Sequence, residues 1–412
     1  MPFQKINLFF ILILLIISGC NSPEKKPLAL PTGDFVFSIL FQDETEKTFK
    51  LPIEVNISSL AGKPLLEIRN GKEIIKVKEI EWRNDSLFFN MPVFLTEFAL
   101  GYSEENFQGT FIKNDREIPV KYEVIGVKGY QRFNANSTQL NIQGNWKTKF
   151  SYPEGESYPA IGEFFQDGNQ ITGTFLTETG DYRYLKGVLD EDSLKLSAFD
   201  GSHAFLFLAQ IKDDSIQGIF KASDTHIEYW KAEKNETFKL ANADSLTYLK
   251  PGSKGISFSL PNLEGETITF PSEKFEGKVV VVQLMGSWCP NCMDETVFLT
   301  ELYNKFNPKG LEIISLAFER FKNFDKAAAA VNRVKTHFGS QYHFLIAGTS
   351  SKESAAKVLP MINAVMSYPT AIFINKKGHV VKIHTGFSGP GTSEYAPYVV
   401  ETTAIIEKLL SE

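Results

Sequence analysis

Cysteine is scarce in this chain of 412 residues, which contains only three. Cys20 closes an apolar segment near the N-terminus, whereas Cys289 and Cys292 lie together in Trp288-Cys289-Pro290-Asn291-Cys292. No cysteine is left to form a structural disulfide elsewhere, so hydrophobic cores must hold the rest of the chain. We therefore interpret Cys289 and Cys292 as a reactive pair rather than as a permanent cross-link.

A surplus of positive charge is also missing. The chain has 43 Lys and Arg against 49 Asp and Glu, which gives a formal net charge of −6. No basic stripe stands out, so the sequence argues against a nucleic-acid-binding protein. The hydrophobic fraction of 43% and the charged fraction of 22% are those of a globular protein. At this length we expect two or three domains, because one core rarely serves so long a chain.

Ligands for a metal are lacking as well. A pair spaced like Cys289 and Cys292 occurs in both zinc sites and redox sites, but tetrahedral zinc needs four ligands and no second cysteine pair exists. Four histidines of the C-terminal third show no ligand spacing: His337, His343, His379 and His384. We expect neither a metal nor another cofactor.

The apolar run at the N-terminus is too short for a comfortable mature membrane helix. It extends from Ile6 to Ile17 after Lys5, and ends in Ile17-Ser18-Gly19-Cys20. This ending resembles a bacterial lipobox, and the alternative is an ordinary signal peptide that ends near a cysteine. The resemblance implies a signal peptide at 1–19, a lipid anchor at Cys20 and a tether at 20–33. The protein would face the periplasm, and since Asn21 is not the aspartate of inner-membrane retention, we expect the outer membrane.

Residues 34 to about 230 read as short alternating strands separated by turns. Many of the 35 phenylalanines fall into such runs, as in Phe35–Phe41 and Gln170–Leu176. Strands that recur this often predict a sandwich or a barrel. A faint internal repeat divides the region into two all-β units, at residues 34–133 and 134–238.

The repeat consists of two short elements at nearly equal spacing. Asn84–Leu87 followed by Phe107–Phe111 is echoed by Glu191–Leu194 followed by Ile216–Phe220. Each copy reads as a turn into a strand, then a strand whose glycine permits a bulge or close packing. Such fragments are common in unrelated β-proteins, so the duplication is a hypothesis.

Residues 239–254 form a polar connector, in which we expect a short helix from about Asp244 to Lys250. The pattern of hydrophobic residues changes after this connector. Strand-like runs then alternate with helix-length segments, which predicts an α/β domain over residues 255–412. Lys278 to Met285 is a nearly continuous apolar run, typical of a strand buried on both faces. The segment from Pro290 to about Phe306 reads as the helix that follows it.

The reactive pair thus lies where a buried strand ends and a helix begins. Pro290 suits the first helical turn, where a missing N–H does no harm. Cys289 would face unpaired N–H groups at the positive end of the helix dipole, which stabilises a thiolate. Cys292 would be shielded and able to attack a mixed disulfide at Cys289. We expect Cys289 to be the exposed cysteine of the two.

Five motifs in combination resemble the TlpA/ResA branch of the thioredoxin superfamily. They cover about residues 255–410 and lie at Phe258–Gly265, Phe275–Val282, Trp288–Glu295, Tyr368–Thr370 and Asn375–Val381. The resemblance implies a thioredoxin fold and thiol–disulfide exchange in the periplasm. It also implies that Cys289 is the attacking thiol and Cys292 the resolving thiol.

The resemblance assigns roles to neighbours of the pair as well. It implies that Pro369 follows a cis peptide bond and flanks the active site. Substrate would be bound by Trp288, by Pro290 and by the backbone of Tyr368.

Two polar residues near the pair also match the branch. Gln283 stands where thioredoxin has a buried aspartate, and an amide is common there in TlpA/ResA-like proteins. Glu295, three residues after Cys292, matches an acidic residue that in ResA-like proteins tunes the pair and helps proton transfer. A solvated residue in an early helical turn would look the same, so both interpretations of Glu295 stay open.

Two functions compete at this point. The first is an enzyme that reduces disulfide-bearing periplasmic proteins and is recharged by a membrane or periplasmic thiol donor. The second is a ligand- or partner-binding envelope lipoprotein in which the β-rich region is the main module; an open aromatic cavity would favour it. A peroxide-reducing enzyme fits less well, because Gly286 stands where such enzymes need a threonine.

Overall fold

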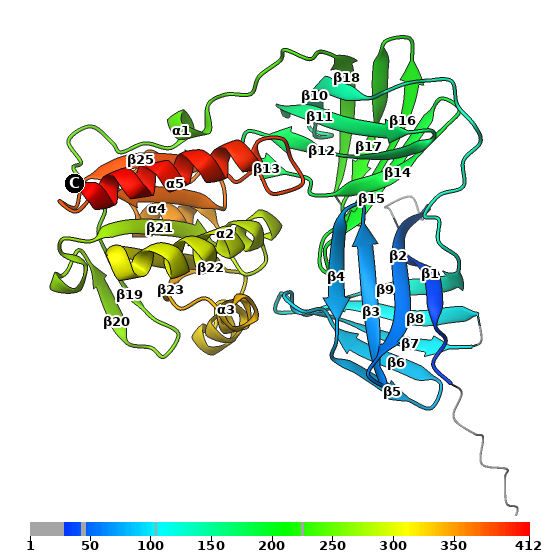
Figure 1. Cartoon of the computed structure of the whole chain (residues 1–412), viewed down its shortest axis with the longest axis horizontal. Coiled ribbons are helices and arrows are strands. Elements are labelled where there is room, and N and C mark those ends of the chain that lie inside the picture. The colour runs from blue at the N-terminus through cyan, green and yellow to red at the C-terminus, as the bar shows by residue number, and fades with distance from the viewer. Residues whose placement is uncertain (1–28, 43–46, 104, 224–225) are drawn as a thin grey trace, which may run out of the picture.

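The computed structural model describes residues 29–42, 47–103, 105–223 and 226–412. The predicted signal peptide, the lipobox and Cys20 lie outside the described residues. Figure 1 shows three units: an α/β unit formed by the C-terminal third, and two β-units that precede it in the chain. This arrangement confirms the predicted fold class, an all-β region followed by an α/β thioredoxin-like domain.

The first β-unit is an antiparallel sheet of nine strands in the order β4-β3-β2-β1-β9-β8-β7-β6-β5. Alternate residues of β1, among them Phe35, Phe37 and Ile39, are buried in one core that also contains Phe98 and Phe111. This period of two is what a strand with one buried face requires. The strands are β1 Gly33–Gln42, β2 Thr48–Leu60, β3 Lys63–Asn70, β4 Glu73–Val77, β5 Ile80–Arg83, β6 Ser86–Asn90, β7 Thr96–Tyr102, β8 Asn106–Lys113 and β9 Val120–Lys128.

The second β-unit closes into a barrel. Its order is β11-β10-β18-β17-β16-β15-β14-β12-β13, and an additional pairing of β11 with β12 closes the ring, with the two-residue strand β13 attached to β12. Aromatic rings fill the interior: the centroids of Phe207 and Phe220 lie 4.5 Å apart, and Phe175 and Phe207 stack at 4.9 Å. The strands are β10 Gly144–Ser151, β11 Ser157–Asp167, β12 Gln170–Thr177, β13 Gly180–Asp181, β14 Leu185–Asp190, β15 Ser193–Phe199, β16 Ala204–Lys212, β17 Ser215–Lys221 and β18 Ile227–Lys234.

The two copies of the sequence repeat have the same local geometry. Asn84 and Glu191, at the start of the turn in each copy, both have positive φ, at 54° and 55°. In both copies a glycine packs against the neighbouring strand: an added Cβ at Gly109 would lie 2.0 Å from the carbonyl oxygen of Ala99, and one at Gly218 would lie 2.3 Å from that of Leu208. The duplication itself stays a prediction.

The C-terminal unit has a five-stranded sheet in the order β23-β22-β21-β24-β25. β21 pairs parallel with β22 and antiparallel with β24. All seven residues of β21 are buried, because helices α2, α3 and α5 contribute to the core on one face and helix α4 with the β19–β20 hairpin to the core on the other. The elements are α1 Ala243–Leu246, β19 Phe258–Pro261, β20 Thr267–Phe270, β21 Val279–Met285, α2 Pro290–Phe306, β22 Leu311–Glu319, α3 Phe324–Phe338, β23 His343–Thr349, α4 Lys352–Val358, β24 Thr370–Ile374, β25 Val380–Thr385 and α5 Tyr395–Ser411.

The helix expected from Asp244 to Lys250 is shorter than predicted. It ends at Leu246, because the chain after it pairs with the C-terminal unit instead. Leu249 forms an isolated bridge with Ile362, and the N–H of Lys250 donates to the carbonyl oxygen of Met361. Within the described part of the chain, no helix is both long enough and apolar enough to cross a membrane.

Candidate active site

Cys289 and Cys292 form a disulfide at the start of α2, with their Cα atoms 5.2 Å apart. Cys289 is the N-cap of this helix and Pro290 occupies its first turn. The backbone N–H of Cys292 donates to the Sγ atom of Cys289 at 3.2 Å. A helix N-terminus offers unpaired N–H groups and a positive dipole end, so this position favours negative charge on the Cys289 sulfur.

The loop before α2 leaves no room for a larger residue at position 286. A Cβ added to Gly286 would lie 2.3 Å from Nε1 of Trp288 and 2.9 Å from the carbonyl oxygen of Phe318. Trp288 occupies that space because its Nε1–H donates to the same carbonyl oxygen, at 2.9 Å. The threonine that peroxide reduction needs would therefore displace Trp288.

The loop before β24 faces the cysteine pair. The Tyr368–Pro369 peptide bond is cis, as the resemblance implies. The carbonyl oxygen of Tyr368 lies 3.4 Å from Sγ of Cys289, and the Tyr368 ring contacts Trp288 edge-on with centroids 5.9 Å apart. The structure thus brings Trp288, Pro290, Tyr368 and Pro369 together around the pair; Cys20 lies outside the described residues.

Glu295 is a buried carboxyl group rather than a solvated helix residue. It has no exposed surface, and its Oε2 accepts a hydrogen bond from Nε2 of Gln283 at 2.9 Å. Gln283 in turn accepts from the hydroxyl of Ser315. Burial raises the pKa of Glu295 to about 8, and the single hydrogen bond from Gln283 offsets this only in part.

A second buried carboxyl group, Glu319, holds the loop in front of the cysteines. It accepts from the backbone N–H of Ser287 at 2.7 Å and from its hydroxyl at 2.6 Å. Burial raises the pKa of Glu319 to about 7. No local sequence pattern assigns a role to Glu319, because only the end of β22 places it beside Ser287.

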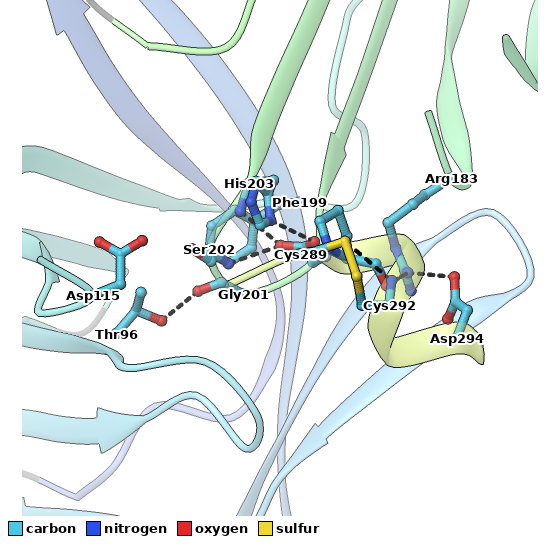
Figure 2. A network of polar contacts seen from close by, with 12 residues as sticks. Thr96, Asp115, Arg183, Phe199, Gly201, Ser202, His203, Cys289, Cys292 and Asp294 are labelled. Atoms are coloured by element: carbon cyan, nitrogen blue, oxygen red, sulfur yellow. Dashed lines mark hydrogen bonds and ion pairs between the residues drawn. A yellow bond between two sulfur atoms is a disulfide. The ribbon is translucent and has the colours of Figure 1, made fainter. Parts of the chain in front are cut away.

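The β-barrel also contributes side chains to the site. Nδ2 of Asn291, between the two cysteines, donates to Oδ2 of Asp181 at 3.0 Å. Arg183 forms an ion pair with Asp294 of α2 at 2.6 Å, and Figure 2 shows this pair beside the disulfide. Sequence reasoning missed both barrel residues, since nothing local marks them.

The expectation that Cys289 is exposed is wrong. Cys289 is only 4% exposed and Cys292 is fully buried. The expectation assumed a free α/β domain, whereas the β-units pack against the face that carries the pair. Phe94, from the loop between β6 and β7, belongs to the same buried cluster as both cysteines.

A disulfide at the start of a helix, beside a cis-proline loop and on a sheet of this topology, defines a thiol–disulfide oxidoreductase of the thioredoxin superfamily. Residues 250–398 match the family model described as Redoxin. The chain belongs to the ResA-like family of thiol–disulfide oxidoreductases, and it catalyses dithiol–disulfide exchange.

Comparison with known proteins finds two ResA relatives and, among solved structures, a thiol:disulfide interchange protein. The thiol-disulfide oxidoreductase ResA of Halalkalibacterium halodurans is 30% identical over 137 residues, which cover 33% of this chain and 69% of that protein. ResA of Bacillus subtilis is 27% identical over 138 residues, or 34% of this chain and 69% of that protein. A solved thiol:disulfide interchange protein of Chlorobium tepidum is 17% identical to this chain. The match covers 38% of this chain and 96% of that protein, with a TM-score of 0.30.

Proposed function

We propose that this protein is a lipid-anchored reductase of disulfides in periplasmic proteins, with Cys289 as the attacking and Cys292 as the resolving thiol. The observation that carries the assignment of roles is the hydrogen bond from the N–H of Cys292 to Sγ of Cys289 at the start of α2. This contact stabilises a thiolate at Cys289 alone, and the thiolate is the nucleophile in disulfide exchange.

The exchange proceeds in two steps. The Cys289 thiolate attacks a substrate disulfide, so that a mixed disulfide forms and the first substrate thiolate leaves. Cys292 then loses its proton and attacks the Cys289 sulfur, which releases the second substrate thiol. The substrate gains two electrons and two protons, and Cys289 and Cys292 end as a disulfide, which a membrane or periplasmic thiol donor must reduce.

Glu295 supports the second step in this proposal. It lies on α2 one turn after Cys292, and its Oε1 has no hydrogen-bond partner among the described residues. With a pKa of about 8 it changes between carboxyl and carboxylate close to neutral pH. Such a group can take the proton from Cys292 and return it to the leaving thiolate.

The assignment of roles is tested by Cys292→Ser in the otherwise unchanged chain. This variant keeps the first attack but lacks the resolving thiol, so mixed disulfides between Cys289 and periplasmic proteins should accumulate. They are detected as adducts on non-reducing gels that disappear with dithiothreitol. Cys289→Ser is the matched control and should give none, and equal trapping by both variants would contradict the roles.

The location of the protein rests on the lipobox ending at Cys20. We expect Cys20→Ser to release the protein from membranes or to leave it unprocessed, because one cysteine carries the whole anchor. Reduction of insulin by the purified protein should not change, since the anchor takes no part in exchange. Membrane retention of a cleaved, unlipidated form would show that something else holds it, and separation of inner and outer membranes tests the preference for the outer one.

The competing function, a ligand-binding β-region, gains no support from the barrel interior. Phe150, Phe164, Phe175 and Phe207 are at most 1% exposed and pack ring against ring there. Such an interior is a core, so the β-units are better suited to docking than to holding a small ligand.

A further inference from the structure

The segment Thr179–Arg183 of the barrel lies across the residues that surround the cysteine pair. The carbonyl oxygen of Thr179 accepts a hydrogen bond from the hydroxyl of Ser367, next to Tyr368, at 3.0 Å. Asp181 accepts from Nδ2 of Asn291 at 3.0 Å and from the N–H of Gly389 at 2.6 Å. We refer to Thr179–Arg183 as the barrel clamp.

Arg183 fastens the clamp to the helix that bears the cysteines. Its Nη1 donates to Oδ2 of Asp294 at 2.6 Å and lies 3.4 Å from the carbonyl oxygen of Pro290. Its Nη2 donates to Glu73, at the start of β4, so that one guanidinium joins all three units. Only 11% of the Arg183 side chain is exposed. Both residues between the cysteines, Pro290 and Asn291, are thus held by the barrel.

Two glycines at the contact between the clamp and the α/β unit have no space for a side chain. A Cβ on Gly180 would lie 3.0 Å from Nδ2 of Asn291, and the φ of Gly180 is +151°. From the other side, a Cβ on Gly386 would lie 2.6 Å from the backbone carbon of Thr179. The clamp and the α/β unit therefore touch backbone to backbone, which leaves no space between them for another chain.

Disulfide exchange cannot occur on a protein substrate in this arrangement. A substrate sulfur must come within bonding distance of Sγ of Cys289, and the chain on either side of it must pass through the space around that atom. Cys289 is 4% exposed. Phe94 of the first β-unit packs in the same buried cluster, and the clamp lies against Ser367 and Asn291, which flank the approach to the cysteine.

We propose that Asp181 and Arg183 are positioning residues of the redox centre, which hold the Pro290–Asn291 dipeptide and must withdraw before a protein disulfide can reach Cys289. This inference rests on the proposed role of Cys289 as the attacking thiol. The contact between the first β-unit and the α/β unit likewise includes ion pairs, of Arg320 with Asp115 and of Lys326 with Glu117. Polar groups of this kind regain water when an interface opens, and relative motion is the default for domain interfaces that are not large and hydrophobic.

The test compares two full-chain variants that loosen the clamp in different ways. Arg183→Ala removes the ion pairs and leaves Glu73 facing Asp294, whereas Gly180→Ala changes no charge and pushes against Asn291. Each reduced protein is treated with a maleimide carrying a bulky polyethylene glycol chain, and the labelling rate of Cys289 is followed by mass spectrometry. We expect both variants to label at least tenfold faster than the natural chain.

Two variants outside the contact serve as matched controls. Lys186→Ala breaks the ion pair with Glu54 between the two β-units, and Gly168→Ala strains a turn whose φ is +61°, where an added Cβ meets no described atom within 4 Å. Both should label within twofold of the natural chain even if they unfold at lower temperature. Labelling within twofold in Arg183→Ala and Gly180→Ala as well would overturn the proposal.

A second measurement separates this proposal from the role of Cys289. The same variants are assayed for reduction of insulin and of 2-hydroxyethyl disulfide, and the ratio of the two rates should rise in favour of insulin. A purely structural role of the clamp would change the unfolding temperature but not that ratio. Faster labelling without reduction of either disulfide would uphold the clamp and refute the proposed function.

Discussion

Among single residues, Glu295 shows most clearly how burial changes chemistry. The same glutamate on a solvated helix face would be charged throughout the physiological range. Here it is fully buried with one hydrogen-bond donor, from Gln283, and its pKa rises to about 8. Gln283 is itself held by Ser315, so the carboxyl group has a fixed position one turn after Cys292.

Replacing Glu295 by Gln tests whether this carboxyl group and the thiols titrate together. The ionised carboxylate opposes a thiolate on the same helix by like-charge repulsion, so Glu295→Gln should move the midpoint of the pH dependence of Cys289 alkylation down by about one pH unit. The rate is measured with iodoacetamide from pH 5 to pH 10. Glu301→Gln, on the exposed side of the same helix, is the control. If the midpoint did not move in Glu295→Gln, Glu295 would have a structural role only.

At the scale of elements, the two β-units share one local feature, a glycine that allows close strand packing. β8 and β17 each carry a glycine whose missing side chain lets the neighbouring strand approach, in a four-strand run that begins with β6 in one copy and β15 in the other. The first strand of each run, β6 or β15, begins two residues after a residue of positive φ, Asn84 or Glu191. The same local geometry at nearly equal spacing is what a duplicated unit would retain.

Alanine at these glycines should therefore have the same effect in both units. In Gly109→Ala and in Gly218→Ala the new Cβ meets a backbone oxygen, which cannot move without disturbing the sheet. We expect each to lower the free energy of unfolding of its own unit by about 1–3 kcal/mol. Gly101→Ala, whose Cβ would lie 3.6 Å from its nearest neighbour, should cost less than about 0.5 kcal/mol. Urea unfolding monitored by hydrogen exchange in β8 and β17 measures the difference, and equal costs at positions 101 and 109 would contradict it.

At the scale of the whole molecule, local signals predicted the elements but not the assembly. Pro290–Phe306 and Phe324–Phe338 were predictable as helices because periodicity, Pro290 in the first turn and Gly339 after the last are all local. The contact of Asp181 with Asn291 joins residues 110 positions apart, and no local pattern encodes it. The same absent information explains why Cys289 was expected on the surface: the barrel that covers it lies elsewhere in the sequence.

The buried carboxyl groups make the stability of the α/β unit depend on pH in a defined direction. Glu295 has an ordinary pKa of 4.5 when unfolded and about 8 when folded, so between these values the folded state binds more protons than the unfolded state. The contribution of Glu295 to the free energy of unfolding then falls as pH rises, by about 1.4 kcal/mol per pH unit, and levels off above pH 8. Glu319, with a folded pKa of about 7, adds a slope of the same sign that ends near pH 7. Burial lowers the pKa of His337 and of His343, so these two groups contribute with the opposite sign around their ordinary pKa of 6.5.

Glu295→Gln should remove its share of this slope while keeping the hydrogen bond from Gln283, because the new amide oxygen can accept it. The measurement is urea unfolding of the oxidised full chain at pH 5, 6, 7 and 8, followed by hydrogen exchange in β21, which is buried throughout. Between pH 7 and pH 8 Glu295 titrates most, because Glu319 and Asp294, with pKa values of about 7, are already half ionised at pH 7. The natural chain should therefore lose about 1 kcal/mol more than the variant over this interval. Glu319→Gln is the matched comparison and should flatten the profile mainly below pH 7. If Glu295→Gln left the slope between pH 7 and pH 8 unchanged, Glu295 would have to be ionised in the folded state already at pH 7, and its place as the proton carrier for Cys292 would fall with it.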